Sequence, residues 1–153
     1  MNSPVIYNAA FPSLKDTDTV VDATRRMLGE RISDLPVVDA SGKLVGLFRL
    51  DRLYAALLPK AALLGGGLVD LAFVSDTLVQ LRQRMHEIDG HPVSEFTVKP
   101  DHVVHPDTPP LQVVLLLHQG ANNIPVVAPD TGKLVGMVSA RDVLVALCEG
   151  ANA

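Results

Sequence analysis

The sequence predicts an α+β fold in which one small unit is present twice, with a helical segment inserted between the two copies. The block 35–38 returns 89 residues later as 124–127 (36 to 125), and the block 42–46 returns unchanged 90 residues later as 132–136 (42 to 132). An Asp-Thr pair stands before each copy, again at a spacing of 89 residues (18 to 107). Three matches in the same order, with one added residue in a turn, indicate a duplicated unit.

The composition limits the classes of protein. The chain has 153 residues, 48% of them hydrophobic, and a unit of about 55 residues is marginal alone, so we expect the two units to pack together. A net charge of −4 offers no basic surface for phosphate backbones, so we expect no nucleic-acid partner. The single cysteine, Cys148, rules out an internal disulfide and a multi-cysteine metal site.

No segment predicts export or membrane insertion. Residues 1–10 lack the basic start and the apolar stretch of a signal peptide. The most apolar run, 53–69, is broken by Pro59, Lys60 and three glycines, and it is shorter than the roughly 20 residues that a membrane span needs. Together with the lone cysteine, these features predict a cytoplasmic protein.

The first copy is expected to form a strand, a helix, two antiparallel strands and a second helix (β-α-β-β-α). Thr19 is the expected N-cap of a helix over about 20–30, because its hydroxyl accepts from a free backbone N–H. Short apolar strands are expected over 36–38 and 43–48, joined by a turn of polar residues and glycine. A second helix follows over about 51–58.

The second copy repeats this order. Thr108 is the expected N-cap of a helix over about 109–119, which two prolines open and Gly120 ends. The run 115–117 is apolar around the whole helix, which predicts that the helix is well buried. The strands follow the recurring blocks, and a last helix is expected over about 140–149.

An insert separates the copies, so the expected division is 1–58 for the first unit with its leading segment, 59–91 for a helical linker, and 92–153 for the second unit. Gly65 to Gly67 favour a sharp bend, and Ser75 or Asp76 is the expected cap of a helix over about 77–88. We expect this helix to lie against the pair or against a partner chain. Its apolar face consists of Leu78, Leu81, Met85 and Ile88.

The repeated pattern resembles a known family. A capped helix, [Leu/Ile]-Pro-Val-Val, a turn, Gly-Lys-Leu-Val-Gly and a short polar motif before a helix are similar to the CBS domain. Two such units in tandem resemble a CBS pair, or Bateman module, over about 10–58 and 92–149, and 92–99 is similar to the strand that precedes the second unit.

The resemblance implies a regulatory or sensory module and not an enzyme. Members pack two units with pseudo-two-fold symmetry around two clefts, where many bind AMP, ADP, ATP, NAD or S-adenosylmethionine, and many form dimers. It therefore implies a stand-alone pair that forms a homodimer, acts on an effector protein that the sequence does not name, and needs no cofactor beyond a regulatory adenosine nucleotide.

The resemblance also implies a ligand site in the second copy, where 136–142 matches the pattern Gly-apolar-x-[Ser/Thr]-x-x-[Asp/Asn] of the nucleotide-binding members. It implies that Ser139 faces a phosphate and that Asp142 accepts from the ribose hydroxyls. The alternative is that Ser139 only caps the helix and that Asp142 only favours the helix dipole. Arg141 either adds positive charge toward the phosphate or is solvated. Further residues that the resemblance assigns to this cleft are Met137, Ile32, Ser33, Ala10 and Phe11.

The first copy departs from this pattern. Arg49 stands where Ser or Thr is expected, Arg52 stands where Asp is expected, and Asp51 is one position early, about 100° around the helix. The second cleft, which pairs these residues with Ala121 and Asn122, is therefore expected to lack ribose recognition. Either it is empty or its two arginines hold an anionic ligand.

Three functions follow as hypotheses. The first is a sensor that binds one adenosine-type ligand at most, and the second is a ligand-free dimerisation or docking module. The third is an enzyme, which the sequence does not favour because no nucleophile with a base and an orienting group stands out. His102 and His105 lie in a loop without metal-ligand spacing, so no metal site is expected.

Overall fold

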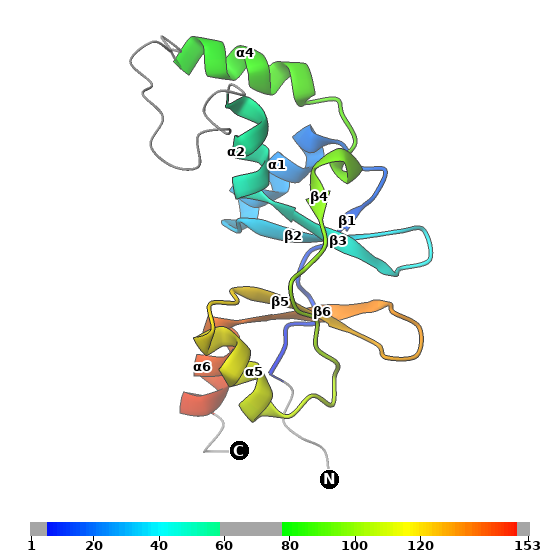
Figure 1. The fold of residues 1–153 in the computed structure, drawn as a ribbon, viewed down its shortest axis with the longest axis vertical. Coiled ribbons are helices and arrows are strands. Elements are labelled where there is room, and N and C mark those ends of the chain that lie inside the picture. Colours follow the sequence, from blue (N-terminus) through cyan, green and yellow to red (C-terminus); the bar gives the residue numbers. More distant parts are fainter. Residues whose placement is uncertain (1–5, 59–77, 150–153) are drawn as a thin grey trace.

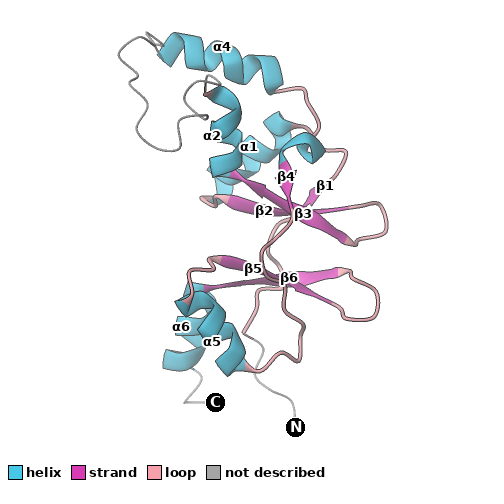
Figure 2. Ribbon diagram, viewed as in Figure 1, coloured by secondary structure: helices cyan, strands magenta, loops and turns pink. Residues whose placement is uncertain are grey.

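The computed structural model describes residues 6–58 and 78–149, which form two halves arranged along the long axis of the molecule (Figure 1). The halves are mixed α and β, as predicted. Their sheets face each other in the middle of the molecule and their helices lie towards its two ends (Figure 2). The first half contains β1 (Leu14–Lys15), α1 (Val20–Glu30), β2 (Asp34–Val38), β3 (Leu44–Arg49), α2 (Leu50–Leu57), α4 (Leu78–Ile88), the short helix η2 (Val93–Phe96) and β4 (Thr97–Val98). The second half contains α5 (Pro110–His118), β5 (Asn123–Val127), β6 (Leu134–Ser139) and α6 (Ala140–Glu149).

The two hairpins show the duplication in the register of their strands. β2 pairs with β3 so that Pro36 lies opposite Leu47, and β5 pairs with β6 so that Pro125 lies opposite Met137. In each hairpin the strand register shifts between the last two residues of the first strand, which are Val37 and Val38 in β2 and Val126 and Val127 in β5. The backbone N–H and C=O of Met137 form their hydrogen bonds with Asn8 and not with Pro125. The proline, which has no N–H, therefore costs this hairpin no hydrogen bond.

The segments that lead into the two units are exchanged between them. β4 pairs antiparallel with β3 of the first unit, with Val98 opposite Leu47. In the same way, Asn8 pairs with Met137 of the second unit. Residues 92–99, which the sequence assigns to the second unit, thus pack on the first, where Val93 is fully buried.

Glycine makes this exchange possible at both crossings. A Cβ atom at Gly46 would lie 2.4 Å from the carbonyl oxygen of Val98, and a Cβ atom at Gly136 would lie 2.6 Å from the carbonyl oxygen of Asn8. The crossing backbone therefore occupies the space that any other side chain would need. The strand that precedes the first helix of each unit lies elsewhere: β1 runs parallel to β2, and Val104 forms a parallel bridge with Val126.

Each half has its own aliphatic core. The cores have no buried polar or charged side chain among the described residues. The first core is Leu14, Val20, Ala23, Met27, Leu35, Val37, Phe48, Leu53 and Val93. The second core is Val104, Val113, Ile124, Val126, Val138 and Val143.

The first helices of the two units begin differently. α1 has the predicted bounds, and Thr19 forms a capping box with Asp22. Thr108, in contrast, is not the N-cap of α5; the hydroxyl of Thr108 accepts from the backbone N–H of His105 at 2.8 Å, and the cap position is Pro109. The prediction for Thr108 is wrong because a residue that precedes a proline is kept out of the helical conformation: Pro109, which precedes Pro110, has a ψ of 136°, so the helix begins only at Pro110.

The prediction that the first helix of the second unit is well buried is also wrong. Val113 is the only buried residue of α5, whereas Leu111 is 81% and Leu115 is 52% exposed. A helix that is apolar all round is buried only where a second surface covers it, and the described part of the chain places none over this side of α5. Gly120, by contrast, ends the helix as predicted, with a φ of 104°.

The insert helix α4 belongs to the first unit. Met85 and Ile88 pack against the first core, and the Arg84 guanidinium donates to the carbonyl oxygen of Leu57 at the end of α2 at 3.0 Å. The segment after α4 accepts hydrogen bonds from the first two N–H groups of α1 through the carbonyls of Asp89 and His91. The predicted glycine bend at 65–67 and the predicted caps at 75 and 76 lie outside the described residues.

Among the helices of the described ranges, none has both the length and the apolar character that crossing a membrane requires.

Candidate functional site

The site is built where the two halves meet. Asp34 and Asn123 are the first residues of β2 and β5, and the Asn123 side-chain amide donates to the Asp34 carboxylate at 3.2 Å. At the other ends of the hairpins, the Leu44 N–H donates to the Gly132 carbonyl at 3.1 Å and the Leu134 N–H donates to the Gly42 carbonyl at 3.0 Å. Equivalent positions of the two copies thus contact each other, so the halves are related by a pseudo-two-fold axis.

Ser139 and Asp142 come together at the start of α6. The Ser139 hydroxyl accepts from the Asp142 N–H at 3.2 Å, and the Asp142 carboxylate accepts from the Ser139 N–H at 3.0 Å. This reciprocal pair is a capping box, the same arrangement that Thr19 and Asp22 form on α1. Both side chains are half-buried, so the pair faces the surface at a helix N-terminus, where backbone dipoles favour an anion.

The other residues predicted for this cleft are distributed over its surroundings. Met137 is fully buried, at 0% exposure, so its side chain is not at a surface where it could flank a base. Phe11 and Ile32 are half-buried and both pack at the margin of the first core. Ala10 is exposed and its N–H donates to the Asn8 side chain at 2.9 Å.

Arg141 and Ser33 were also predicted to belong to one cluster with Ser139 and Asp142, and the structure places them differently. Arg141 is exposed on α6. Ser33 is exposed, and its carbonyl accepts from the N–H of Leu50 at 3.0 Å. Ser33 lines a hollow of about 310 Å3 together with Arg49, Asp51 and Asn122, so it lies with residues that were predicted for the second cleft.

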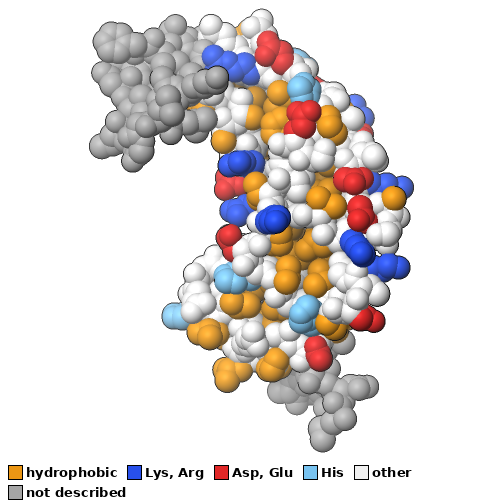
Figure 3. Space-filling view, turned by 45° about the vertical axis from the view of Figure 1, so that its right-hand side comes forward, with side chains coloured by type: hydrophobic (Ala, Val, Ile, Leu, Met, Phe, Trp, Pro, Cys, Tyr) orange, Lys and Arg blue, Asp and Glu red, His pale blue; other side chains and the backbone are white. Residues whose placement is uncertain are grey.

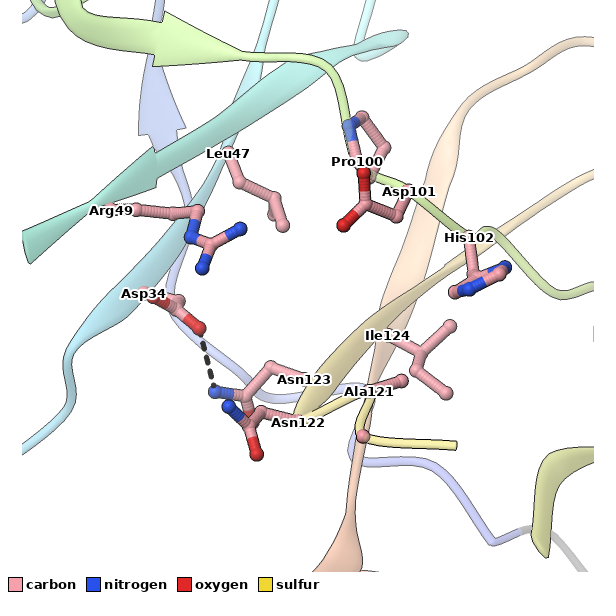
Figure 4. Close-up of a pocket in the computed structure, with 11 residues that line it drawn as sticks. Asp34, Leu47, Arg49, Pro100, Asp101, His102, Ala121, Asn122, Asn123 and Ile124 are labelled. Atoms are coloured by element: carbon pink, nitrogen blue, oxygen red, sulfur yellow. Dashed lines mark hydrogen bonds between the residues drawn. The ribbon is translucent and has the colours of Figure 1, made fainter. Parts of the chain in front are cut away.

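Another hollow, of about 100 Å3, lies at the second cleft, which contains the motif of the first copy (Figure 4). It is lined by three of the five residues predicted there, Arg49, Ala121 and Asn122. Arg49 is the last residue of β3, and its side chain extends into the hollow, which Asp34 and Asn123 bound on one side (Figure 4). Arg52 does not line either hollow; it is exposed on α2.

The other eight of the eleven residues that line this hollow were not predicted for it, and three of these eight come from one segment. They are Pro100, Asp101 and His102, which follow β4 in the segment between the units. The duplication held the signal for two of them, because Pro100 and Asp101 lie 90 residues after Ala10 and Phe11, which were predicted for the other cleft.

The charges of the second cleft do not form a two-arginine anion site. The Arg49 guanidinium makes an ion pair with Asp51 at 3.2 Å, and Asp34 and Asp101 add two more carboxylates around it. The Nε of Arg49 is buried and has no hydrogen-bond partner among the described residues. The cleft thus combines one arginine with a majority of acidic groups, which does not favour a phosphate-rich ligand.

No group of three histidine, cysteine or acidic side chains within 6–58 and 78–149 has the arrangement of a metal site. His105 hydrogen-bonds the carbonyl of Val127 through Nδ1 at 2.9 Å, and His91 pairs with Glu95 at 2.7 Å. Cys148 is a free, exposed thiol.

Comparisons with known proteins agree with this architecture. The family model of the CBS domain matches residues 1–59 and 93–149. A search of the curated proteins found no match to the chain.

Solved structures match the whole described fold. The crystal structure of CBSX2 from Arabidopsis thaliana has a TM-score of 0.73 and 22% identity, and the match covers 100% of this chain and 99% of that chain. A complex of CBSX2 with AMP has a TM-score of 0.68 and 21% identity, over 97% and 99% of the two chains. A CBS domain-containing protein of unknown function from Kribbella flavida has a TM-score of 0.71 and 19% identity, over 94% and 96%. At these identities the likeness shows the fold.

Proposed function

The chain belongs to the CBS domain family, and from this premise we propose that it is a regulatory module that binds one adenosine-type ligand beside the start of α6. The candidate ligands are AMP, ADP, ATP, NAD and S-adenosylmethionine. The module passes the bound state to an effector protein, and the chain itself catalyses no reaction. A cytoplasmic location stays a prediction.

One observation carries this proposal: the second unit keeps a hydroxyl and a carboxylate together at the helix start, whereas the first unit has Arg49 and Asp51 there. A serine hydroxyl and the free N–H groups of a helix N-terminus are donors that suit a phosphate. The carboxylate of Asp142 accepts from two neighbouring hydroxyls, as a ribose offers. The structure of a similar protein, CBSX2, in complex with AMP supports the class of ligand.

The test is isothermal titration of the full chain with each of the five ligands. Asp142→Ala is expected to abolish binding. Because Asp142 also caps α6, the matched control is Asp22→Ala, which removes the equivalent carboxylate from the capping box of α1, away from the cleft. The control is expected to lose stability and to keep its affinity. Equal binding by the parent and Asp142→Ala, or loss of binding in both variants, contradicts the assignment of Asp142.

The second candidate is a ligand-free docking module. It is favoured by the fact that Ser139 and Asp142 satisfy each other's hydrogen bonds, so the start of α6 is capped without a ligand. A chain that binds none of the five ligands, and whose melting temperature none of them changes, would support this candidate.

We also propose that the chain forms a homodimer. The supporting observation is the number of large apolar side chains that are exposed on the helices, six of them on α5 and α6. Such surfaces in small proteins are commonly interaction sites.

A further inference from the structure

The turns of the two hairpins meet on the pseudo-two-fold axis and place two lysines opposite each other. Lys43 and Lys133 form an antiparallel bridge. The hydrogen bonds of this bridge are made by the residues on either side of the lysines, so the lysines are a non-hydrogen-bonded pair. In such a pair the Cα atoms are about 4.5 Å apart and both side chains lie on the same face. Two lysine side chains therefore project side by side from the point where the halves meet.

The charges of this pair are only partly matched, although like charges directly opposite each other on paired strands are destabilising. In the first unit the Asp39 carboxylate accepts from the backbone N–H of Lys43 at 3.0 Å, so it lies beside that lysine. The second unit has Ala128 at the equivalent position; the N–H of Asp39 and that of Ala128 each donate to the carbonyl of the lysine of their own turn at 2.9 Å. Within 6–58 and 78–149, Lys133 forms no ion pair, neither with the exposed Asp130 of its own turn nor with any other acidic group.

An apolar hollow of about 350 Å3 lies beside the lysine pair. Its apolar lining comes from both units and from the segment between them: Leu44, Val45, Pro100, Val103 and Val127. Lys99 and Gly132, the residue before Lys133, complete the lining, and Lys99 is exposed and has no ion pair in the described ranges. Figure 3, in which the hairpin turns come forward, shows hydrophobic side chains at the middle of the molecule with Lys or Arg side chains on both sides of them.

The other side of the axis differs in sequence. At the spacing of 90 residues that relates the two leading segments (8 to 98), Lys99 corresponds to Ala9 and Val103 corresponds to Ser13. The positive charge and one apolar wall of the hollow are thus missing from the other copy. The duplicated fold therefore does not require them, and a role in binding explains why one side has them.

We propose that this surface binds a short acidic segment of the effector protein. We call it the hairpin-turn surface; it consists of Lys43, Lys99, Lys133 and the apolar hollow. One large apolar side chain of the segment enters the hollow, where its burial is favourable. Carboxylates on either side of that side chain meet the lysines, which select an acidic partner and fix its orientation. The inference rests on the effector proposed above and gives the chemistry of the segment that docks.

The position of the surface suits a regulatory contact. Leu44 and Val45 belong to the first unit, whereas Val127 and Gly132 belong to the second. A ligand that changes how the two units pack therefore changes the shape of the hollow. The coupling is reciprocal, so the docked segment changes the affinity for that ligand by the same factor.

The experiment begins with a library of random peptides displayed on phage and selected on the immobilised full chain. The enriched peptides are expected to carry acidic residues on both sides of a large apolar residue. The most enriched peptide is then labelled with a fluorophore, and its affinity for the parent and for each variant is measured by fluorescence anisotropy.

Two variants with matched controls locate the site. Val103→Glu is expected to weaken binding roughly 30-fold or more, as loss of a central apolar contact does, and its control is Val79→Glu, at an exposed valine of α4. Lys133→Glu is expected to weaken binding about 5-fold or more. Its control, with the same change of charge, is Arg25→Glu at an exposed position of α1. Both controls are expected to keep the parent's affinity, and circular dichroism verifies that all four variants are folded.

A neutral variant separates binding from stability. Lys133→Gln removes the repulsion with Lys43, so it is expected to raise the melting temperature at low salt while it weakens the binding of the peptide. A lower melting temperature contradicts the argument, because Lys133 would then stabilise the fold.

Each failure has a distinct meaning. A selection that enriches no peptide, or a peptide whose affinity Val103→Glu and Lys133→Glu leave unchanged, overturns the hairpin-turn surface. Sedimentation of the chain with vesicles of phosphatidylcholine and phosphatidylserine, without any enriched peptide, replaces the acidic segment with a lipid surface and overturns the proposal as well. Titration with the five ligands tests the sensor separately. A monomeric parent in light scattering overturns the homodimer and leaves this surface intact, because all its residues lie in one chain.

Discussion

The backbones of Asn8 and Met137 exchange two hydrogen bonds, one of 2.7 Å from the Asn8 N–H and one of 3.1 Å from the Met137 N–H. Asn8 precedes the first unit in the chain, and Met137 lies in the middle strand of the second. The equivalent pair in the other half, 90 residues away in each case, is Val98 and Leu47. Each unit is thus completed by the segment that leads into the other.

The first prediction concerns the glycines under these crossings. Gly136→Ala and Gly46→Ala are each expected to lower the free energy of unfolding by about 1–3 kcal/mol, because the new methyl group meets a backbone carbonyl that cannot turn away. The control is Gly29→Ala, since a Cβ atom there has no neighbour within 4 Å and alanine favours the helix. Urea unfolding of the three variants measures the difference. Equal stability of all three would show that the crossing segments move aside without cost.

The second prediction concerns the contact on the pseudo-two-fold axis. Asn123→Asp replaces the donor to Asp34 with a second carboxylate at a 3.2 Å contact, so it is expected to destabilise the protein by about 1–2 kcal/mol at neutral pH. Protonation of one carboxylate at lower pH relieves the repulsion, so the loss is expected to shrink below about pH 5. Asn122→Asp, at the exposed neighbouring position, is the control. A loss that does not depend on pH would contradict repulsion as the cause.

The third prediction concerns the end of α1. Arg31 has a φ of 56° and ends the helix where the second unit uses Gly120. Because this left-handed conformation costs a non-glycine residue about 1 kcal/mol, Arg31→Gly is expected to raise the melting temperature by about 2–4 °C. Gly120→Ala, the opposite change at the equivalent position, is expected to lower it. Calorimetry of both variants checks the prediction, which fails if Arg31→Gly is less stable than the parent.

The fourth prediction concerns pH. The backbone N–H and the hydroxyl of Thr19 donate to the Asp22 carboxylate at 3.1 and 2.9 Å, and these bonds lower the pKa of Asp22 below its ordinary value. Stability from a lowered carboxyl pKa is fully present above the ordinary value of about 3.9 and is lost as the pH falls through the lower folded value. Asp22→Asn is therefore expected to melt below the parent at pH 7 and to approach it near pH 2. A gap of constant size over this range would contradict the prediction.

The local structure of both units could be predicted because each element carries its own signal. The helix over 20–30 begins at a capping threonine and has a regular apolar spacing, and its predicted and observed bounds agree. The pairing of Ser139 with Asp142 also follows from local sequence, since residues three apart meet at a helix start.

The exchange of the leading segments could not be predicted in this way. The pattern of 92–99 identifies an extended segment, but both units offer it the same glycine, Gly46 or Gly136, in the same surrounding sequence. Only the geometry of the connection decides between them. The residues 100–102 of the second cleft were missed for a related reason, because they form a loop without periodicity.

The predicted burial of α5 failed because burial depends on a neighbour that periodicity does not describe. Leu115 is a large apolar residue in the apolar run 115–117, from which burial was predicted, yet it is 52% exposed. The sequence of the helix indicates that it needs a cover and does not indicate what provides the cover.

The exchanged segments also bear on the origin of the duplication. A single unit with this topology would leave its leading segment unpaired and its own glycine groove open, so it would be complete only as a pair of chains that swap these segments. Fusion of two copies turns that swap into an event within one chain, at a high effective concentration. The 153-residue chain is on this view a covalently linked descendant of a segment-swapped dimer.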